Sequence, residues 1–444
     1  MGTKRAADVS SLTGARGSAG YAADVPDAFA ELQNRLAEIH DIRTAAGLMQ
    51  WDQEVMMPPG GAPTRAEQRA TLERIAHQRF VDDEMGRLFD GAREIEESLP
   101  YDSDEASLVR VARRDWEKAR RVPTDLAAEM TRVSSQAVEA WARARTESDF
   151  AAFKPWLQKT LDLKQRYIAC FDPADEPYDV LLDDFEPGMK TATVRAVFDR
   201  LKTELVPLIA AARTTEDFAF MSGPFAEEDQ HALSIELLEK MGMTPGAYRL
   251  DTTVHPFCSG TATQDIRLTT RYDVNSLASL FTAMHEGGHG LYEHGVSASL
   301  ERTPLCSGCS AALHESQSRL WENVVGRSLP FWRWFFPRLQ ATFPGVLGLV
   351  ELDDFHRAVN AVRPSFIRVD ADEATYGCTS SCVSSSSWSS SPERCPSTIC
   401  PTRGTAALRS TWVSTCRRIG SAAFRTFTGR SAPSDTSPRT RSAT

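Results

Sequence analysis

The chain has 444 residues, of which 41% are hydrophobic and 25% charged, and its formal net charge is −10. This length and apolar content allow a sizeable core, in one large domain or two closely packed subdomains. The negative charge argues against a nucleic-acid partner or an acidic membrane surface, and no run of about 18 apolar residues predicts a membrane span. Residues 1–6 also lack the apolar core of a signal peptide, so we expect a cytoplasmic protein.

Apolar residues at helical spacing recur along most of the chain, so we predict a mainly α fold. The first 24 residues are small and polar, and we expect this segment, 1–24, to be disordered. The predicted helices span 25–48, 63–77, 104–119, 123–148, 150–169 and 191–241. Strand-like stretches at 248–257 and 264–272 would form a small β-sheet beside a cleft, just before the most informative segment of the chain.

That segment is His285-Glu286-Gly287-Gly288-His289. Apolar residues at 277, 280, 281 and 284 predict a helix here, opened by an Asn or Ser cap. The two imidazoles then share one face, so they can bind one ion while Glu286 acts as general base on a water molecule, as in zinc peptidases. A chance match occurs in about one chain per hundred of this length. Gly287 and Gly288 are unfavourable in a helix, which indicates that backbone or substrate approaches closely there.

A catalytic zinc site needs a third protein ligand. Glu293 and His294 lie further along the same helix, where the helical rise carries them away from the ion. Glu315 and Glu322 belong to a second amphipathic helix, predicted at 313–322, and either can face the first helix. We favour Glu315, partly because of the resemblance that follows.

Six segments stand in order along the chain: Trp51-Asp52-Gln53-Glu54, His255-Pro256-Phe257, Asp265-Ile266-Arg267-Leu268-Thr269, residues 285–289, His314-Glu315-Ser316-Gln317 and Ile367-Arg368-Val369-Asp370-Ala371-Asp372. Together they resemble the carboxypeptidase Taq family of metallocarboxypeptidases over residues 25–376. The resemblance implies a large helical metallopeptidase in which His285, His289 and Glu315 hold one Zn²⁺ per chain, with Co²⁺ as the alternative. It also implies that Glu286 activates the water, that peptides lose their C-terminal residues with broad specificity, and that the protein is a homodimer.

A carboxypeptidase must recognise a free terminal carboxylate, and the planar fork of an arginine does so with two hydrogen bonds. By the resemblance, Arg267 and Arg368 are the candidates for this substrate contact. Each can instead be a merely structural arginine, Arg267 paired with Asp265 and Arg368 with Asp370 or Asp372. His255 lies in a strand-like stretch that could pair with substrate backbone, and it would donate to the reacting carbonyl. Taken alone, it fits a hydrogen-bonded core histidine better.

Residues 377–444 differ in composition from the rest, because they hold five of the nine cysteines and many serines without helical periodicity. The family's last signature, Gly-x-x-Gln-Asp-x-His-Trp, is absent. Codons can nevertheless be chosen for residues 377–382 that read Leu-His-Val-Leu in another register. In that same register, codons for residues 422–429 can read Gln-Asp-Val-His-Trp. We therefore expect 25–376 to be the catalytic domain without its C-terminal part, and 377–444 to be a frameshifted, disordered tail.

Three alternatives remain beside a working carboxypeptidase with ordinary cysteines. The chain could be an inactive or misfolded product that retains metal binding only. An endopeptidase using the same motif is disfavoured, because carboxylate-binding arginines suit an exopeptidase. Cys306-Ser307-Gly308-Cys309 could be a redox or zinc pair, but no second cysteine pair precedes the tail, so we interpret both residues as ordinary thiols.

Overall fold

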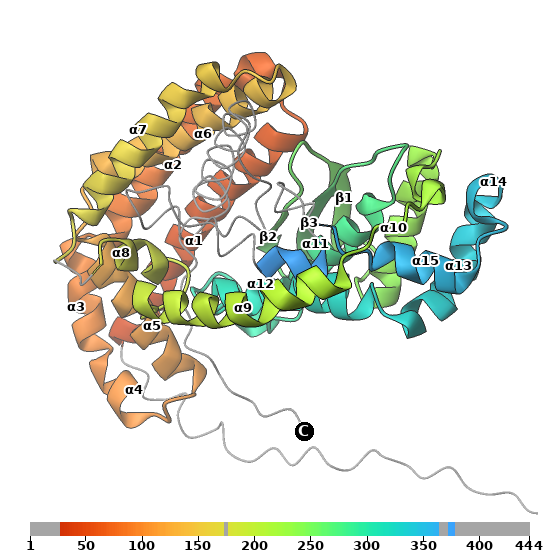
Figure 1. Ribbon diagram of the computed structural model, residues 1–444. Helices are drawn as coiled ribbons and strands as arrows, with labels where there is room; N and C mark the ends of the chain where they lie inside the picture. The colour runs from red at the N-terminus through yellow and green to blue at the C-terminus, as the bar shows by residue number, and fades with distance from the viewer. Residues whose placement is uncertain (1–26, 173–175, 364–371, 378–444) are drawn as a thin grey trace, which may run out of the picture.

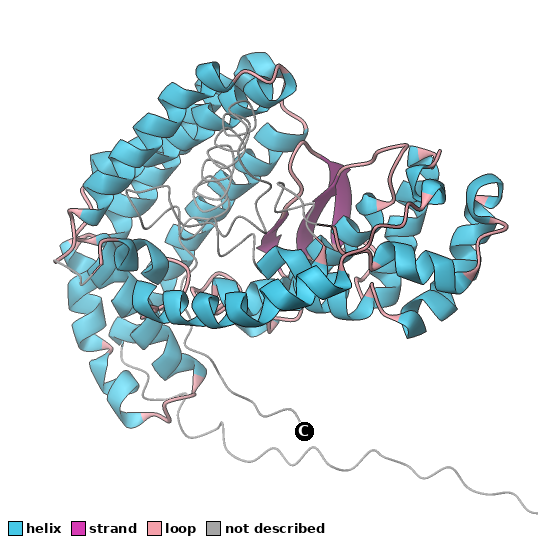
Figure 2. Cartoon of the chain, in the orientation of Figure 1, coloured by secondary structure: helices cyan, strands magenta, loops and turns pink. Residues whose placement is uncertain are grey.

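The computed structural model describes residues 27–172, 176–363 and 372–377. Helices make up most of these residues, and a three-stranded sheet lies between two groups of helices (Figure 1, Figure 2). The predicted mainly α fold with a small sheet is therefore confirmed. The expected disordered segment 1–24 and the tail from residue 378 onward lie outside the described residues.

The first group of helices comes from the N-terminal part of the chain and packs around several apolar clusters. It consists of α1 (Asp27–Val55), α2 (Ala62–Phe80), α3 (Asp83–Gly91), α4 (Arg93–Ser98), α5 (Asp104–Ala119), α6 (Thr124–Thr146), α7 (Phe150–Ile168) and α8 (Tyr178–Asp183). A side chain caps α5 at its start, where the Ser103 hydroxyl accepts a hydrogen bond from the N–H of Ala106 at 3.2 Å. Leu32 and Phe89 are fully buried in the largest of these clusters, which α1, α2, α3 and α5 share. The helices predicted between residues 25 and 169 all form.

The second group of helices surrounds a core rich in aromatic side chains. It consists of α10 (Glu227–Met241), α11 (Ala278–His294), α12 (Ala311–Arg319), the π-helical turn η4 (Leu320–Val325), α13 (Leu329–Thr342), α14 (Pro344–Leu347) and α15 (Leu352–Val359). Trp332 and Phe355 meet at a centroid distance of 4.6 Å, and Leu280 and Met284 of α11 belong to the same core. One side of α11 therefore packs against this core.

The helix predicted at 191–241 is two helices, so that prediction was wrong in its extent. Helix α9 (Thr191–Ala212) ends well before α10 begins at Glu227. Between them lie Gly223, with φ of +79°, and Pro224. Proline has no backbone N–H to donate and a residue with positive φ leaves the helical conformation, so the helix cannot continue through this pair.

The sheet contains β1 (Tyr248–Thr252), β2 (Cys258–Ala262) and β3 (Asp265–Thr270) in the order β1-β3-β2. Strand β1 is parallel to β3, whereas β2 forms an antiparallel hairpin with it. The strand predicted at 248–257 was too long, because it ends at Thr252 before the loop that contains Pro256. The second predicted strand, 264–272, corresponds to β3. Sequence reasoning missed β2, which has few β-branched or aromatic residues.

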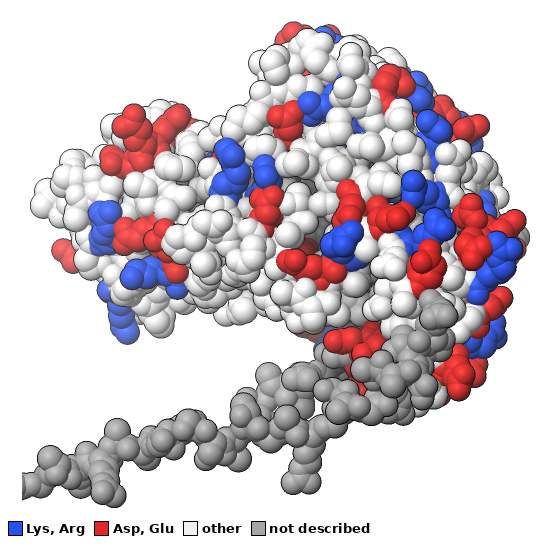
Figure 3. Space-filling view, turned by 180° about the vertical axis from the view of Figure 1, so that it is seen from behind, with Lys and Arg blue, Asp and Glu red and all other residues white. Residues whose placement is uncertain are grey.

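The surface shows no separation of charge on the face drawn in Figure 3, where acidic and basic side chains are interspersed. That face therefore lacks the extended basic surface typical of nucleic-acid binding. Among the helices that the structure describes, none is sufficiently long and apolar to cross a membrane.

Candidate metal centre

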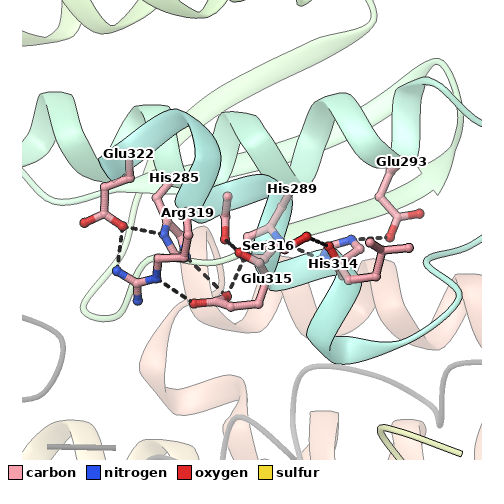
Figure 4. A network of polar contacts seen from close by, with 10 residues as sticks. His285, His289, Glu293, His314, Glu315, Ser316, Arg319 and Glu322 are labelled. Atoms are coloured by element: carbon pink, nitrogen blue, oxygen red, sulfur yellow. Dashed lines mark hydrogen bonds and ion pairs between the residues drawn. The ribbon is translucent and has the colours of Figure 1, made fainter. Parts of the chain in front are cut away.

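Helix α11 carries the motif at residues 285–289 and is the central element of the site. The N-cap residue of α11 is Leu277, which makes no side-chain cap bond, so the predicted Asn or Ser cap was wrong; the Ser276 hydroxyl accepts from the N–H of Ala278 at 3.1 Å just before it. Leu280 and Met284, each 1% exposed, pack into the aromatic core. Because this apolar stripe fixes the rotation of the helix, His285 and His289 face α12 (Figure 4).

The two glycines of the motif allow neighbouring helices to approach α11 closely. A Cβ atom on Gly288 would lie 2.6 Å from the carbonyl oxygen of Gln317 in α12, and one on Gly287 would lie 2.5 Å from a methyl group of Leu238 in α10. The expectation of a close backbone approach is therefore confirmed at Gly288. Because α12 lies so close to α11, Glu315 can contact both histidines.

A Gly288→Ala substitution is expected to destabilise the fold by about 1–3 kcal/mol, because the new methyl group would force α12 away from α11. The same shift should weaken metal binding, because it moves Glu315. Urea unfolding and zinc titration would measure both effects. The control is Gly47→Ala in α1, where a Cβ atom would meet nothing within 4 Å and alanine favours the helix. Equal stability of the two variants would contradict this account of Gly288.

Three potential ligand atoms converge between α11 and α12. The Glu315 Oε2 atom lies 3.3 Å from Nε2 of His289 and 3.7 Å from Nε2 of His285. Ligand atoms of these three residues all lie within 4.8 Å of one another. Glu315 lies in the second turn of α12, whose start is capped by the Ser310 hydroxyl, which accepts from the N–H of Leu313 at 3.3 Å. Two imidazole nitrogens and one carboxylate oxygen are a donor set that three-ligand zinc sites use.

Arg319 fixes the other oxygen of the Glu315 carboxylate. Its Nε atom donates to Glu315 Oε1 at 3.0 Å, one helical turn further along. Burial alone would raise the pKa of Glu315. The hydrogen bond from His289, together with the charges of His285 and Arg319, outweighs burial and holds that pKa well below its usual range. Glu315 is therefore a carboxylate, the form that a metal requires.

Glu322 lies on the opposite side of His285 from Glu315. Its Oε2 atom is 2.7 Å from the Nδ1 atom of His285 and 2.8 Å from Nη1 of Arg319. Burial opposes ionisation of Glu322, but the hydrogen bond and charge of His285 lower the pKa of this carboxyl overall. Glu322 therefore orients the His285 ring and leaves the Nε2 atom facing Glu315, as outer partners of metal-binding histidines do.

His289 also has a partner on its Nδ1 atom, namely Nδ1 of His314 at 2.6 Å. The Nε2 atom of His314 in turn lies 2.9 Å from Glu293 Oε1. The Nδ1 atoms of His285 and His289 thus contact Glu322 and His314, respectively. The Nε2 atoms of both residues face Glu315. This orientation fits a bound divalent ion, because each histidine can present a lone pair to it.

The sequence matches the carboxypeptidase Taq (M32) metallopeptidase family over residues 31–378. It is also 40% identical over 351 residues to thermostable carboxypeptidase 1 of Thermus thermophilus, which covers 76% of this chain and 68% of that protein. This chain belongs to the carboxypeptidase Taq family. Carboxypeptidase 1 of Bacillus subtilis is 35% identical over 350 residues, covering 78% of this chain and 70% of that protein. The chain is therefore a metallocarboxypeptidase that acts on peptides and uses a divalent metal.

Solved structures of carboxypeptidases share the fold. The crystal structure of the protein named BsuCP superposes with a TM-score of 0.81 at 30% identity, covering 92% of this chain and 84% of that one. The M32 carboxypeptidase of Deinococcus radiodurans R1 gives a TM-score of 0.72 at 33% identity, covering 93% and 78%. These similarities confirm the large helical metallopeptidase fold.

In this carboxypeptidase Arg267 lies on β3 with its guanidinium already paired. Its Nε and Nη2 atoms donate to the two oxygens of Asp265, each at 3.1 Å, and its charge lies over the ring of Trp51 at 4.4 Å. The pairing of Arg267 with Asp265, which the sequence left as an alternative, is therefore present. A substrate carboxylate would have to share this guanidinium with Asp265.

Of the other two predicted substrate contacts, the structure describes only His255. His255 lies in the loop after β1, so the prediction that a strand carries it was wrong, because the strand ends at Thr252. Its ring meets Trp141 of α6 edge-on at a centroid distance of 6.1 Å. Arg368 lies outside the described residues.

Cys306 and Cys309 are free thiols in the loop between α11 and α12. Burial, with smaller contributions from Glu293 and Glu301, raises the pKa of Cys306 to about 11. A thiol with so high a pKa is a poor nucleophile near neutral pH, which supports the interpretation of this pair as ordinary thiols.

Proposed function

We propose that this carboxypeptidase holds one divalent ion between His285, His289 and Glu315 and uses Glu286 as its general base. The observation that carries the proposal is the convergence of three ligand atoms within 4.8 Å, directly beside Glu286 on α11. When bound, the ion would polarise the scissile carbonyl and make a water molecule acidic enough to react near neutral pH. Glu286 would accept a proton from the attacking water and return it to the leaving amine.

Zinc is the proposed ion, with cobalt as the alternative. Two imidazole nitrogens and one carboxylate oxygen are ligands that both metals accept, and zinc uses this combination in hydrolytic enzymes. The outer hydrogen bonds to Nδ1 of both histidines support the same proposal, because they orient Nε2 for one small ion.

The substrate is proposed to be a peptide with a free C-terminal carboxylate and a variable last residue. Arg267 and Arg368 are the proposed carboxylate contacts, and His255 is the proposed donor to the reacting carbonyl. Arg267 can take part only through guanidinium hydrogens that Asp265 does not use. A cytoplasmic homodimer without nucleic-acid or membrane partners completes the proposal.

The test compares a peptide that ends in a free carboxylate with the same peptide amidated at its C-terminus. We expect stepwise release of single residues from the free peptide and at least about 10²-fold slower cleavage of the amide, because the arginine fork would lack its anion. A chelator should stop the reaction, and added zinc should restore it. Internal cleavage of the amidated peptide would show an endopeptidase instead.

A second proposal concerns the residues after Tyr376. We infer that residues 377–444 are a frameshifted tail, and the end of the family match at residue 378 supports this inference. Resequencing the DNA across codons 370–385 tests it, because an extra base there would restore the helical register. If the sequence stands as written and zinc binds without peptide hydrolysis, the chain is the inactive product that retains metal binding only.

A further inference from the structure

The metal ligands belong to two facing rows of side chains. On α11 the residues His285, His289 and Glu293 follow one another at intervals of four, so they lie along one side of the helix. The facing row begins with Glu322 opposite His285, continues with Glu315 and ends with His314 beside His289 and Glu293 (Figure 4). The proposed ligands thus occupy the middle of the double row, and both ends carry an acid.

The two histidines reach these end acids in different ways. His285 contacts Glu322 directly at 2.7 Å, whereas His314 connects His289 to Glu293. The rings of His289 and His314 are inclined by 20°, with centroids 4.5 Å apart and Nδ1 atoms 2.6 Å apart. The two rings are therefore stacked with their Nδ1 atoms in hydrogen-bond contact, and one proton can lie between these nitrogens.

His314 is held firmly in this position. It is 6% exposed, the ring of Tyr292 packs edge-on against it at 5.2 Å, and a Cβ atom on Gly308 would lie only 2.6 Å from its ring. The loop before α12 thus closes over the His314 ring. Glu293, whose side chain is 11% exposed, is equally enclosed.

The direction of both hydrogen bonds follows from Glu293, the acceptor at the end of the series His289, His314 and Glu293. An ionised Glu293 has no proton to donate, so Nε2 of His314 must carry the proton of that bond. A neutral His314 then has a lone pair on Nδ1 and accepts from Nδ1–H of His289. An ion that binds Nε2 of His289 displaces the proton which that atom gives to Glu315, and His289 then keeps its one proton on Nδ1.

We propose that His314 and Glu293 are positioning residues that hold His289 in the one tautomer able to bind the metal. The proposal rests on the metal site proposed above. Without Glu293, His314 could protonate on Nδ1 instead, and His289 would then carry its proton on Nε2, where the ion has to bind. The expected readout is therefore the affinity of the chain for zinc, measured without any substrate.

Three variants of the full-length protein test this series of hydrogen bonds. Their zinc affinity is measured by titration against a competing chelator. Glu293→Leu and His314→Phe are each expected to weaken zinc binding about 10- to 100-fold. Glu293→Gln should lie between wild type and Glu293→Leu, because its amide oxygen can still accept from His314. The double variant Glu293→Leu/His314→Phe should lose no more than about the larger single effect, because the two residues act in series. The visible spectrum of bound Co²⁺ should change in the same variants.

The control is His294→Gln, next to Glu293 on α11. His294 bonds to the carbonyl oxygen of Thr263 at 2.6 Å and to the Thr244 hydroxyl at 3.1 Å, outside the double row. It should keep wild-type zinc affinity. Zinc affinities within about threefold of wild type in Glu293→Leu and His314→Phe, or fully additive losses in the double variant, would overturn the proposal. If Glu293→Leu fails to fold, Glu293→Gln with the affinity of the His294→Gln control overturns it as well. Failure of wild type to bind one zinc ion would instead refute the metal site itself.

Discussion

The Glu286→Gln variant is expected to keep its metal and to hydrolyse peptides about 10²- to 10⁴-fold more slowly than the unchanged chain. Glutamine has nearly the shape of glutamate but cannot accept a proton from the attacking water. Glu286 is 4% exposed and follows His285 directly on α11, so an isosteric side chain should leave the ligands in place. The measurements are kcat for release of a C-terminal residue and the metal content of the same preparation.

A second Glu→Gln variant, at a residue outside the site, shows whether the loss of one negative charge is enough to lower kcat. Glu236 on α10 pairs with Arg338 at 2.9 Å and takes no part in the site, so Glu236→Gln should retain wild-type kcat. Turnover by Glu286→Gln at the rate of this control would remove Glu286 from the role of general base.

The Glu315→Ala variant is expected to lose at least about 10² in zinc affinity, more than the loss of an outer partner usually causes. It removes the one oxygen that faces both Nε2 atoms and leaves two histidines, which cannot complete a three-ligand site. The fold should persist, because the Glu315 side chain is 38% exposed and Arg319 keeps its contact with Glu322. Zinc titration and the melting temperature of the metal-free chain measure the two effects separately.

Glu322→Gln provides the discriminating comparison, because sequence reasoning left both acids open. Glu322 contacts Nδ1 of His285, so its change should weaken zinc binding about 10- to 100-fold and less than Glu315→Ala does. If Glu322→Gln were the more damaging variant, the assignment of ligand and outer partner would have to be exchanged.

Local sequence patterns predicted the elements that depend on nearby residues. The apolar stripe before His285 predicted α11, and the spacing of the histidines placed both on one side of it. The break between α9 and α10 could also have been read from Gly223-Pro224, had the turn signal been weighted above the apolar period. Strand β2 offered no such signal, because its small residues form a strand only through pairing with β3.

The outer partners carried only a partial signal. The spacing of Glu293 after His289, and of Arg319 and Glu322 after Glu315, places these residues on shared helix faces. Spacing shows which residues share a face, but it does not show which atoms of a neighbouring helix they meet. His314, adjacent to Glu315, was therefore not recognised as the residue that connects Glu293 to His289.

The sequence by itself determined the helical class, the motif helix, the family and the candidate ligands, because each depends on spacing along one element or on ordered motifs. Only the tertiary structure decided that Glu315 faces both Nε2 atoms while Glu322 lies behind His285. It also decided that Arg267 is paired with Asp265 and that His255 lies in a loop. The physical reason is that these roles depend on how closely α12 approaches Gly288 and where β1 ends, and both follow from packing between distant segments.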